Sequence, residues 1–349
     1  MRRPFFSVVI VTYNRCNFLK ANLSILLQQT FKDYEVIISD NASTDETSNV
    51  VKLFKDKRIK YIRNKENIGF PKNIKQAMLN ASGKYIFTLG DDDFILYDDA
   101  LSKIKKILDK KSYGIVRLNI LERNYHGSGL QRKLMNISQD KYISENTDIS
   151  QILNFYKSVD IGMMSGIIFR NEDITPRKFI ICETYPWFKI VIENTQKFGA
   201  CFSANNYMVI TWTAATNKQP SWVVRKDGSL EFEPYDRALF EFIPKREQQS
   251  FRLNYYKNFI RLLPVVKFYS TNRNLIRFVR RLIQLVPTLK NNIKLWVMFF
   301  IAFITPKFIW LKARLIYHRI NNKIEHIPNL ELINARYRYL LTHYCKFLK

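Results

Sequence analysis

Three adjacent carboxylates, Asp91, Asp92 and Asp93, follow the short apolar segment YIFTL and a glycine. Adjacent carboxylates repel one another, and a bound cation removes that repulsion. Hard divalent ions such as Mn²⁺ and Mg²⁺ prefer oxygen ligands and often share their coordination shell with phosphates. The triplet therefore predicts a metal site, with Asp93 and Asp91 as ligands beside a bound diphosphate. A solvated acidic turn before a helix is the alternative, because aspartate is favoured there too.

Polar side chains also end two other apolar segments. Thr12, Tyr13 and Asn14 close the segment that begins FFSVVIV, where the tyrosine ring could stack on a base and the polar groups could orient it. Asp40 follows YEVII, and its carboxylate could accept a hydrogen bond from a nucleobase or a ribose hydroxyl. The simpler roles are a strand-to-helix turn at the first position and an Asx-turn at Asp40.

A loop further along the chain, NIGFPKN, begins at Asn67 and ends at Asn73. Gly69 would let the backbone approach a ligand closely, and Lys72 could meet a phosphate. A plain loop that leads into a helix cap is the alternative for this segment.

The segments that carry these residues alternate between strand and helix patterns. Strands are predicted at 5–12, 34–38, 60–63 and 85–89, and helices at 17–29, 46–54, 71–80 and 98–108, with Ser43 or Thr44 capping the second helix. This alternation implies right-handed βαβ crossovers and a parallel sheet covered on both faces. Ligands of such sheets bind beyond the carboxyl ends of the strands, so the polar clusters should converge on one crevice.

The rest of the chain has weaker patterns and a strongly basic end. Strands are expected at 162–169, 201–211 and 222–224, and a helix at 186–198. The four cysteines form no CxxC pair, which argues against a disulfide framework or zinc site and fits a reducing compartment. The two arginines and apolar run at the N-terminus fit a buried first strand better than a signal peptide.

The last hundred residues, 250–349, hold 19 basic and 2 acidic side chains of a chain whose net charge is +26. Within them, the apolar stretch 295–305 is too short to cross a bilayer, which takes about 20 residues. Basic and apolar side chains alternate elsewhere in this part, as in helices that lie in a membrane interface. A helical cap on the rest of the chain would leave the shortage of acids unexplained. A nucleic-acid-binding protein is the other class, but no known nucleic-acid module is present.

The segments VVIVTYNR, VIISDNASTDET and ENIGFPKNIKQAMLNASGKYIFTLGDDDF together resemble the inverting nucleotide-sugar glycosyltransferases of family 2, which have the GT-A fold. They occur in the family's order and at its spacing. The resemblance is close over residues 5–105 and continues more weakly to about 245. The GDDD form and the later Tyr185-Pro186 are also similar to the abequosyltransferase-like subgroup from O-antigen assembly.

The resemblance implies an inverting, metal-dependent sugar transfer with Mn²⁺ or Mg²⁺. It places Asp91 at the ribose and Asp93 on the metal. The remaining nucleotide-sugar-binding residues would be Thr12, Tyr13, Asn14, Asp40, Asn67, Lys72 and Asp92. Lys72 stands where the family often has arginine. The family's acidic motif before a helix has only a partial match here, at Glu183, which we expect to be the general base. Glu193 and Asp160 are the alternatives, as is a surface role for Glu183.

The implied architecture is a GT-A α/β domain, a Rossmann-like mostly parallel sheet flanked by helices, over residues 1–249. Residues 1–110 would bind the nucleotide sugar and 111–249 the acceptor, followed by a basic amphipathic helical membrane-associating region, 250–349. The expected acceptor is a lipid-linked saccharide of a bacterial surface polysaccharide such as O-antigen or capsule. The partners would be that acceptor, the donor and the anionic inner face of the cytoplasmic membrane, where the cytoplasmic enzyme would be peripheral, with no nucleic acid. A sugar nucleotidyltransferase is the alternative enzyme, although the segment TYNRCNF lacks its glycine-rich phosphate loop.

Overall fold

The computed structural model describes residues 3–123, 130–133, 135, 137–156, 163–172, 174–179, 186–211, 245–257, 259–260, 263–269, 271–306, 308–309 and 330–344. The chain divides into two compact units, one made of residues 1–214 with 324–349 and the other of residues 215–323. The boundary expected from the sequence was at 249/250. In the structure the second unit begins at residue 215, and the last residues of the chain, 324–349, group with the first unit.

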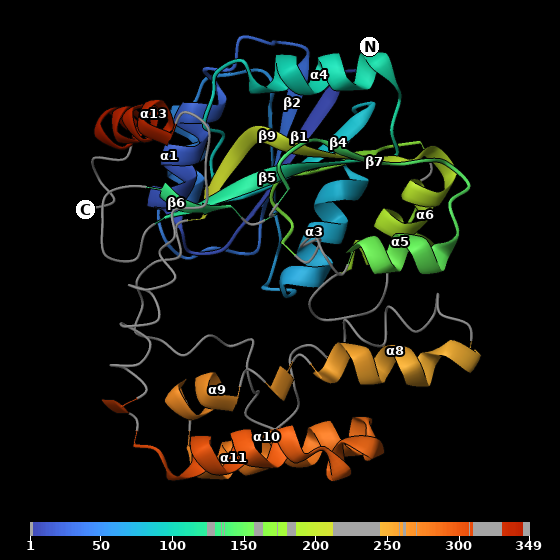
Figure 1. Cartoon of the computed structure of the whole chain (residues 1–349). Helices are drawn as coiled ribbons and strands as arrows, with labels where there is room; N and C mark the ends of the chain where they lie inside the picture. Colours follow the sequence, from blue (N-terminus) through green and yellow to red (C-terminus); the bar gives the residue numbers. More distant parts are fainter. Residues whose placement is uncertain are drawn as a thin grey trace. The chain divides into compact units, whose positions relative to one another are not determined.

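The first unit is built on one mixed sheet with the strand order β3-β2-β1-β4-β8-β5-β9-β7, and β6 pairs with β5 (Figure 1). Its strands are β1 (Phe6–Thr12), β2 (Tyr34–Asp40), β3 (Ile59–Arg63), β4 (Tyr85–Gly90), β5 (Ile115–Arg123), β6 (Leu130–Lys133), β7 (Lys141–Ile143), β8 (Ile167–Arg170) and β9 (Ala200–Thr211). Strands β1 to β4 are parallel, as predicted. Beyond β4 the sheet is mixed, because β8 lies between β4 and β5 and runs antiparallel to both, while β5 and β9 are parallel.

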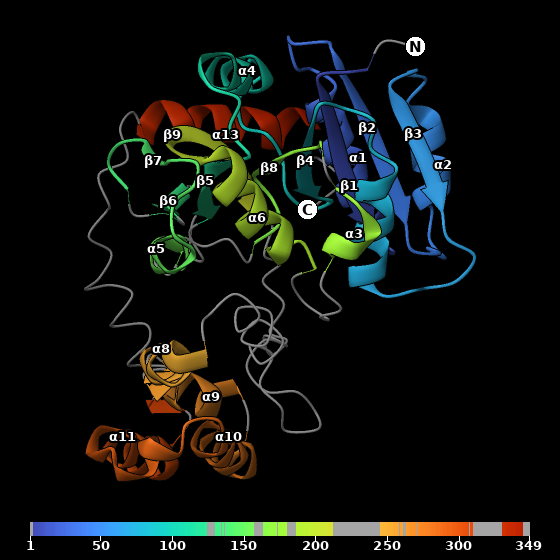
Figure 2. The same ribbon diagram turned by 90° about the vertical axis from the view of Figure 1, so that its right-hand side faces the viewer.

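Helices cover both faces of this sheet (Figures 1 and 2). They are α1 (Cys16–Leu26), α2 (Thr47–Leu53), α3 (Phe70–Leu79), α4 (Ala100–Lys110), α5 (Ile149–Tyr156), α6 (Phe188–Phe198) and α13 (Leu330–Tyr344). Apolar residues of α1, α2 and α4 share one core with β1, β2 and β4, while α3 and α6 lie on the other side of the sheet. Every residue of β1 is buried, which explains why the strand is apolar except at Ser7 and Thr12. In α4, Leu101, Ile104 and Leu108 form the buried stripe of an amphipathic helix.

The predicted cap of α2 is wrong. The helix begins at Thr47, and its first backbone N–H donates to the Asp45 carboxylate (3.1 Å), not to Ser43 or Thr44. The Ser43 hydroxyl instead accepts a hydrogen bond from the backbone N–H of Asn14 (2.9 Å). Ser43 is unavailable as a cap because it holds the loop after β1 against the loop after β2.

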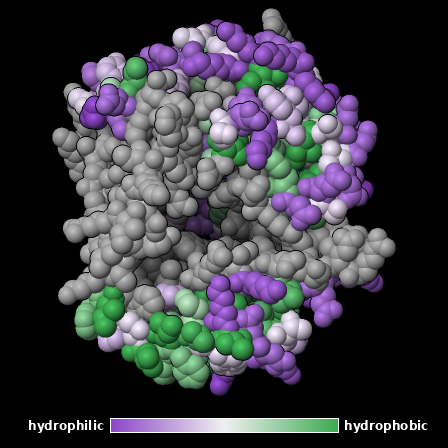
Figure 3. Space-filling view, viewed as in Figure 1, coloured by the Kyte–Doolittle hydropathy of each residue, from purple (hydrophilic) through white to green (hydrophobic). Residues whose placement is uncertain are grey.

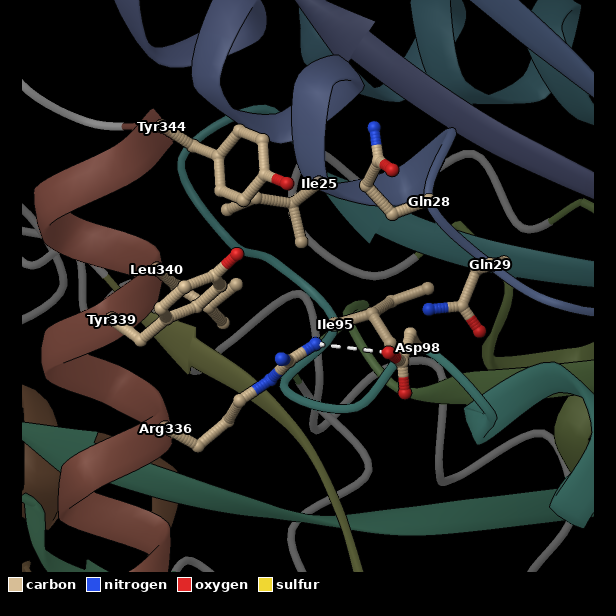
Figure 4. Close-up of a pocket in the computed structure, with 9 residues that line it drawn as sticks. All are labelled: Ile25, Gln28, Gln29, Ile95, Asp98, Arg336, Tyr339, Leu340 and Tyr344. Carbon is tan, nitrogen blue, oxygen red and sulfur yellow. Dashed lines mark ion pairs between the residues drawn. The ribbon is translucent and has the colours of Figure 1, made fainter.

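The C-terminal helix α13 packs on the first unit, although it belongs to the basic end of the chain. Tyr337 stacks on Phe94, the residue after the acidic triplet, with 6.3 Å between the ring centroids. Arg336 forms an ion pair with Asp98 (3.5 Å) and donates to the backbone carbonyl of Leu96 (3.2 Å). Figure 4 shows this contact, which borders a cavity of about 160 Å³ between α1, α13 and the segment after β4.

The second unit is helical where it is described: α8 (Lys245–Lys257), α9 (Leu263–Tyr269), α10 (Asn272–Leu285), the short 3-10 helix η3 (Pro287–Asn291) and α11 (Ile293–Ile304). These helices share a core of their own, to which Leu275, Phe278 and Leu282 of α10 contribute. Pro287 begins η3 and Pro306 follows α11, as expected of prolines that separate helices. Among the described residues, no helix is both long enough and apolar enough to span a bilayer.

Candidate functional site

The carboxyl ends of β1, β2 and β4 bring the predicted polar clusters together. Thr12 lies beside Asp40 in the register of β1 and β2, and Val11 lies beside Gly90 in the register of β1 and β4. The Thr12 hydroxyl donates to Asp91 (2.8 Å), so the end of β1 contacts the acidic triplet directly. Parallel strands place their carboxyl ends at one edge, and the sequence predicted this meeting from that rule.

The first two carboxylates of the triplet share one cationic partner, Arg15. A single guanidinium nitrogen lies 3.2 Å from Asp91 Oδ1 and 2.6 Å from Asp92 Oδ2. Asp91 is buried, whereas Asp92 is partly exposed. Sequence reasoning assigned no role to Arg15, although it is the last residue of the segment VVIVTYNR. The available signal was an arginine between the end of a strand and the start of a helix, since Arg15 is the N-cap residue of α1.

Asp93 is the most enclosed of the three carboxylates, and it is held from two sides. Its Oδ2 accepts a hydrogen bond from the Ser165 hydroxyl, which itself accepts from the backbone N–H of Gly90 (2.8 Å). The Asn22 amide donates to the backbone carbonyls of both Gly90 (2.8 Å) and Asp93. The other oxygen, Oδ1, is buried and has no hydrogen-bond partner among the described residues. Ser165 and Asn22 come from distant parts of the sequence, so no local pattern indicated them.

Burial makes negative charge costly at this site. Burial raises the pKa of Asp91 to about 6, with a contribution from Asp92 that Arg15 and Thr12 partly oppose. Burial likewise raises the pKa of Asp93 well above its ordinary range, and the charge of Asp92 adds to the effect. Without a further cation, the charged forms of Asp91 and Asp93 are therefore less favourable than those of ordinary aspartates, and a bound divalent ion would oppose that effect.

Asp40 has no exposed surface, and both of its oxygens are engaged. Oδ1 accepts from the backbone N–H of Ser43 (2.9 Å), and Oδ2 accepts from the Tyr61 hydroxyl (2.5 Å). Arg63 lies 3.7 Å from the same carboxylate. The turn-closing role that was the alternative for Asp40 is thus present in the structure. This carboxylate shapes the loop after β2, which contacts the loop after β1 at Asn14.

Tyr13 and Asn14 differ in what they offer a ligand. The Tyr13 side chain is 44% exposed and so presents a ring at the edge of the sheet. Asn14 has a positive φ of 53°, and its side-chain oxygen accepts from the backbone N–H of Thr44 (2.7 Å). Asparagine tolerates this left-handed conformation better than most residues. Asn14 therefore joins two loops at the edge of the sheet.

The loop before α3 is organised by asparagine side chains. Asn67 accepts from the Asn41 amide (2.7 Å) and from the backbone N–H of Gly69 (2.9 Å). Gly69 has a φ of 79°, which side chains other than glycine rarely adopt. The side chain of Asn73 is buried and donates to the backbone carbonyl of Ser39 (3.0 Å). These contacts connect the loop to the end of β2.

Lys72, the predicted phosphate contact, is exposed in the first turn of α3. It makes no ion pair with any residue that the structure describes. Its charge is therefore not neutralised by a described carboxylate, as a phosphate-binding lysine requires.

The three candidates for the general base do not all fall within the described residues. Glu183 and Asp160 lie outside them. Glu193 is on α6, where it pairs with Lys178 (3.3 Å) and Lys189 (3.9 Å). Among the residues with described positions, no hydrogen bond or ion pair joins Glu193 to the acidic triplet, so its role as a base stays a prediction.

Comparison with known proteins gives one family. The model described as "Glycosyl transferase family 2" matches residues 7–174. An uncharacterized glycosyltransferase of Haemophilus influenzae is 30% identical over 190 residues, which cover 53% of this chain and 57% of that protein. The GalNAc(5)-diNAcBac-PP-undecaprenol beta-1,3-glucosyltransferase of Campylobacter jejuni is 33% identical over 37% of this chain and 44% of its own length. The chain thus spans less than two thirds of either relative.

Among solved structures, S. aureus TarS 1-349 in complex with UDP-GlcNAc is similar, with a TM-score of 0.56 and 16% identity. The superposition covers 96% of this chain and 91% of that one. At this identity the likeness concerns the fold alone, and it confirms the predicted GT-A fold.

Proposed function

We propose that this chain, whose residues 7–174 match the model of glycosyl transferase family 2, transfers a sugar from a nucleotide-sugar donor to a hydroxyl group of an acceptor. One observation supports the proposal above the others. At the carboxyl edge of the sheet, the buried Asp93 has one oxygen without a described hydrogen-bond partner, and the Thr12 hydroxyl contacts the neighbouring Asp91. That arrangement suits a ligand that carries a cation.

A divalent ion fits the side chains at this edge. Asp93 Oδ1 is available as a ligand, and Asp91 lies close by, although it is paired with Arg15. The described residues include no group of three or more His, Cys, Asp or Glu side chains placed to hold a metal. The protein would therefore supply one or two carboxylates, and the donor diphosphate and water would complete the shell. A bound Mn²⁺ or Mg²⁺ would offset the negative charge that develops on the leaving diphosphate.

The side chains around the carboxylates have distinct proposed roles toward the donor. Tyr13 offers its ring to the nucleobase, with Thr12 and Asn14 beside it. Asp40 would act on the nucleobase region by closing the loop after β2. Asn67 would order the loop before α3. Lys72, which has no ion pair among the described residues, would contact the diphosphate. Asp91 and Asp92 lie toward the ribose and diphosphate, where Arg15 keeps their charges balanced before the donor binds.

The transfer itself would be a displacement at the anomeric carbon with inversion of configuration, as in the rest of the family. Glu183 would accept the proton of the acceptor hydroxyl as its oxygen attacks opposite the leaving nucleoside diphosphate. Glu183 precedes α6, the position of the family's acidic motif. Asp160 is the alternative base.

A lipid-linked saccharide is the acceptor that we favour, and the enzyme would then act on the inner face of the cytoplasmic membrane. The name of the Campylobacter jejuni relative specifies an undecaprenol-linked acceptor, which supports this choice. Residues 250–323 hold 15 basic side chains and no acidic one, which favours an anionic surface. A bacterial surface polysaccharide such as O-antigen or capsule would be the product.

The test is donor binding measured by thermal shift with UDP-, dTDP-, CDP- and GDP-sugars, with Mn²⁺ or with a chelator. A ligand that binds the native state raises its melting temperature. We expect one nucleotide class to do so only with Mn²⁺. Asp93→Asn should abolish that shift and the transfer, and it should leave the melting temperature of the free protein unchanged or higher, because a buried charge is removed.

Asp40→Ala should weaken the same donor shift by disturbing the loop after β2. A stabilising shift that is equal in Mn²⁺ and in chelator would refute the metal site. No shift with any nucleotide sugar, either with Mn²⁺ or with chelator, would refute the proposed function.

A further inference from the structure

One side of α11 exposes a continuous row of large apolar side chains. Ile293 is 80% exposed, Val297 50%, Phe300 59% and Ile304 72%. These positions are spaced by four, three and four residues, so they lie along one side of the helix. Trp296 and Ile301, also exposed, widen the row on either side. We call these six residues the α11 apolar face.

The opposite side of the same helix is already used. Leu295 and Ala302 have no exposed surface and belong to the core of the second unit, with Met298, Phe299 and Phe303 packed against it. The helix is therefore apolar all round, yet only half of it is buried. An apolar helix surface of this size on a folded unit indicates a binding surface, because monomeric soluble proteins rarely leave one uncovered.

Positively charged side chains on α10 and α11 indicate the kind of partner that would cover the α11 apolar face. Lys294 is exposed at the edge of the α11 apolar face, and Lys290 is exposed just before the helix. On α10, Arg273 and Arg280 are exposed while the apolar residues of that helix point into the core. Figure 3 shows hydrophobic side chains gathered over these helices next to hydrophilic ones. Residues 250–323 contain no acidic side chain, so none of them would repel an anionic partner.

Several apolar residues that the sequence pattern predicted to contact the membrane are instead buried inside the second unit. Phe259 and Phe278 are buried in the core of the second unit. Lys267 is also buried, and its amino group donates to the Asn272 side chain. These residues hold the helices together, and the exposed apolar surface is concentrated on α11.

We propose that the α11 apolar face inserts into the headgroup and upper acyl region of an anionic lipid bilayer, with Lys290, Lys294, Arg273 and Arg280 contacting the lipid phosphates. An interfacial helix of this kind buries its apolar side about 5–10 Å deep and gains electrostatic attraction from the anionic headgroups. Trp296 fits this position, because its indole N–H is held by the backbone carbonyl of Lys290 (2.6 Å) at the polar end of the row. The inference deepens the proposed function, since it names the surface that would bring the active site to a lipid-linked acceptor.

The experiment is flotation of the full-length chain with phosphatidylglycerol vesicles and with phosphatidylcholine vesicles. We expect the chain to float with the anionic vesicles and much less with the neutral ones. The double variant Phe300→Glu/Ile304→Glu should bind about tenfold or more weakly, because two inserted apolar side chains are lost and two charges must enter the interface. Raising the salt concentration should weaken binding of the parent chain without abolishing it, since salt screens only the charged part.

The matched control is Leu53→Glu on α2, which makes the same kind of change at a leucine that is 66% exposed in the first unit. It should float like the parent chain. Circular dichroism and thermal unfolding of the double variant establish that it is folded, as expected for substitutions at exposed positions. Equal flotation of the parent chain and the double variant, or no flotation of the parent, would overturn the proposal.

A second copy of the chain is the competing occupant of this face. A parent dimer that becomes monomeric in the double variant, with vesicle binding unchanged, would also overturn the membrane assignment. Nucleotide-sugar binding without lipid separates this inference from the proposed function. The double variant should retain it, and a chain that floats but binds no nucleotide sugar would refute the function while leaving the membrane surface in place.

Discussion

At the scale of single residues, the site depends on side chains that hold the carboxylates rather than on the carboxylates alone. Ser165 is such a positioning residue, because its hydroxyl donates to Asp93 Oδ2 and leaves Oδ1 directed toward the site. Groups that orient a metal ligand affect metal affinity nearly as strongly as the ligand itself. Arg15 has a comparable role at Asp91 and Asp92.

We expect Ser165→Ala to raise the Mn²⁺ concentration needed for half-maximal activity about 10- to 100-fold. Activity at saturating Mn²⁺ should return close to that of the parent, because the ligand itself is still present. Ser24→Ala is the control, since its hydroxyl bonds only to the backbone carbonyl of Lys20 (2.8 Å) within α1. An unchanged Mn²⁺ dependence in Ser165→Ala would show that Asp93 does not bind the metal in this orientation.

The proposed general base can also be tested by substitutions of single residues. Glu183→Gln should lower turnover by about 10²–10⁴-fold with little change in donor affinity, because an amide cannot accept the acceptor's proton. Glu193→Gln should stay within a few-fold of the parent, since Glu193 is paired with Lys178 and Lys189. Rates of sugar transfer under saturating donor measure both. The opposite order of effects would move the assignment to Glu193, and two small effects would move it to Asp160.

At the scale of elements, α13 reinforces the segment that leaves the acidic triplet. Phe94 follows Asp93 directly and stacks on Tyr337, while Ile333 and Leu340 complete the same buried cluster. Arg336 adds contacts to the next residues of that segment, at Leu96 and Asp98. The last described helix of the chain therefore restrains the loop that carries the proposed metal ligands.

Tyr337→Ala should destabilise the first unit by about 3–5 kcal/mol, the usual cost of truncating a large buried aromatic side chain. Leu332→Ala on the same helix is the control, because Leu332 is 74% exposed and its loss should change stability by no more than about 0.5 kcal/mol. Chemical denaturation of both variants measures the difference. Equal stabilities would mean that α13 does not hold the segment after β4.

At the scale of the whole molecule, charge and apolar surface are divided between the two units. The first unit holds the buried carboxylates of the acidic triplet, and a bound cation would stabilise their negative charge. The second holds the exposed α11 apolar face and includes residues 250–323, which contain no acidic side chain. In our proposals, a nucleotide sugar and a lipid surface would bind to different units. The flotation and donor-binding measurements test the two separately, because neither requires the other partner.

The N-terminal half of the fold could be predicted from the sequence because its signals are local. Alternating strand and helix patterns located β1 to β4 and the helices between them, and the carboxyl-edge rule then brought Thr12, Asp40 and the triplet together. Each step needed only periodicity within one segment and a general rule of handedness. The role of Glu183 as base and the contacts of each residue with a donor stay predictions.

Only the tertiary structure decided the partners that come from distant segments. Ser165 reaches Asp93 because β8 inserts antiparallel beside β4, and α13 reaches Phe94 across more than two hundred residues of sequence. The sequence of α11 is apolar on every side, so its pattern could not tell the buried side from the exposed one. Those choices depend on which surfaces pack together to remove the most apolar area from water, and such packing joins residues that no local pattern relates.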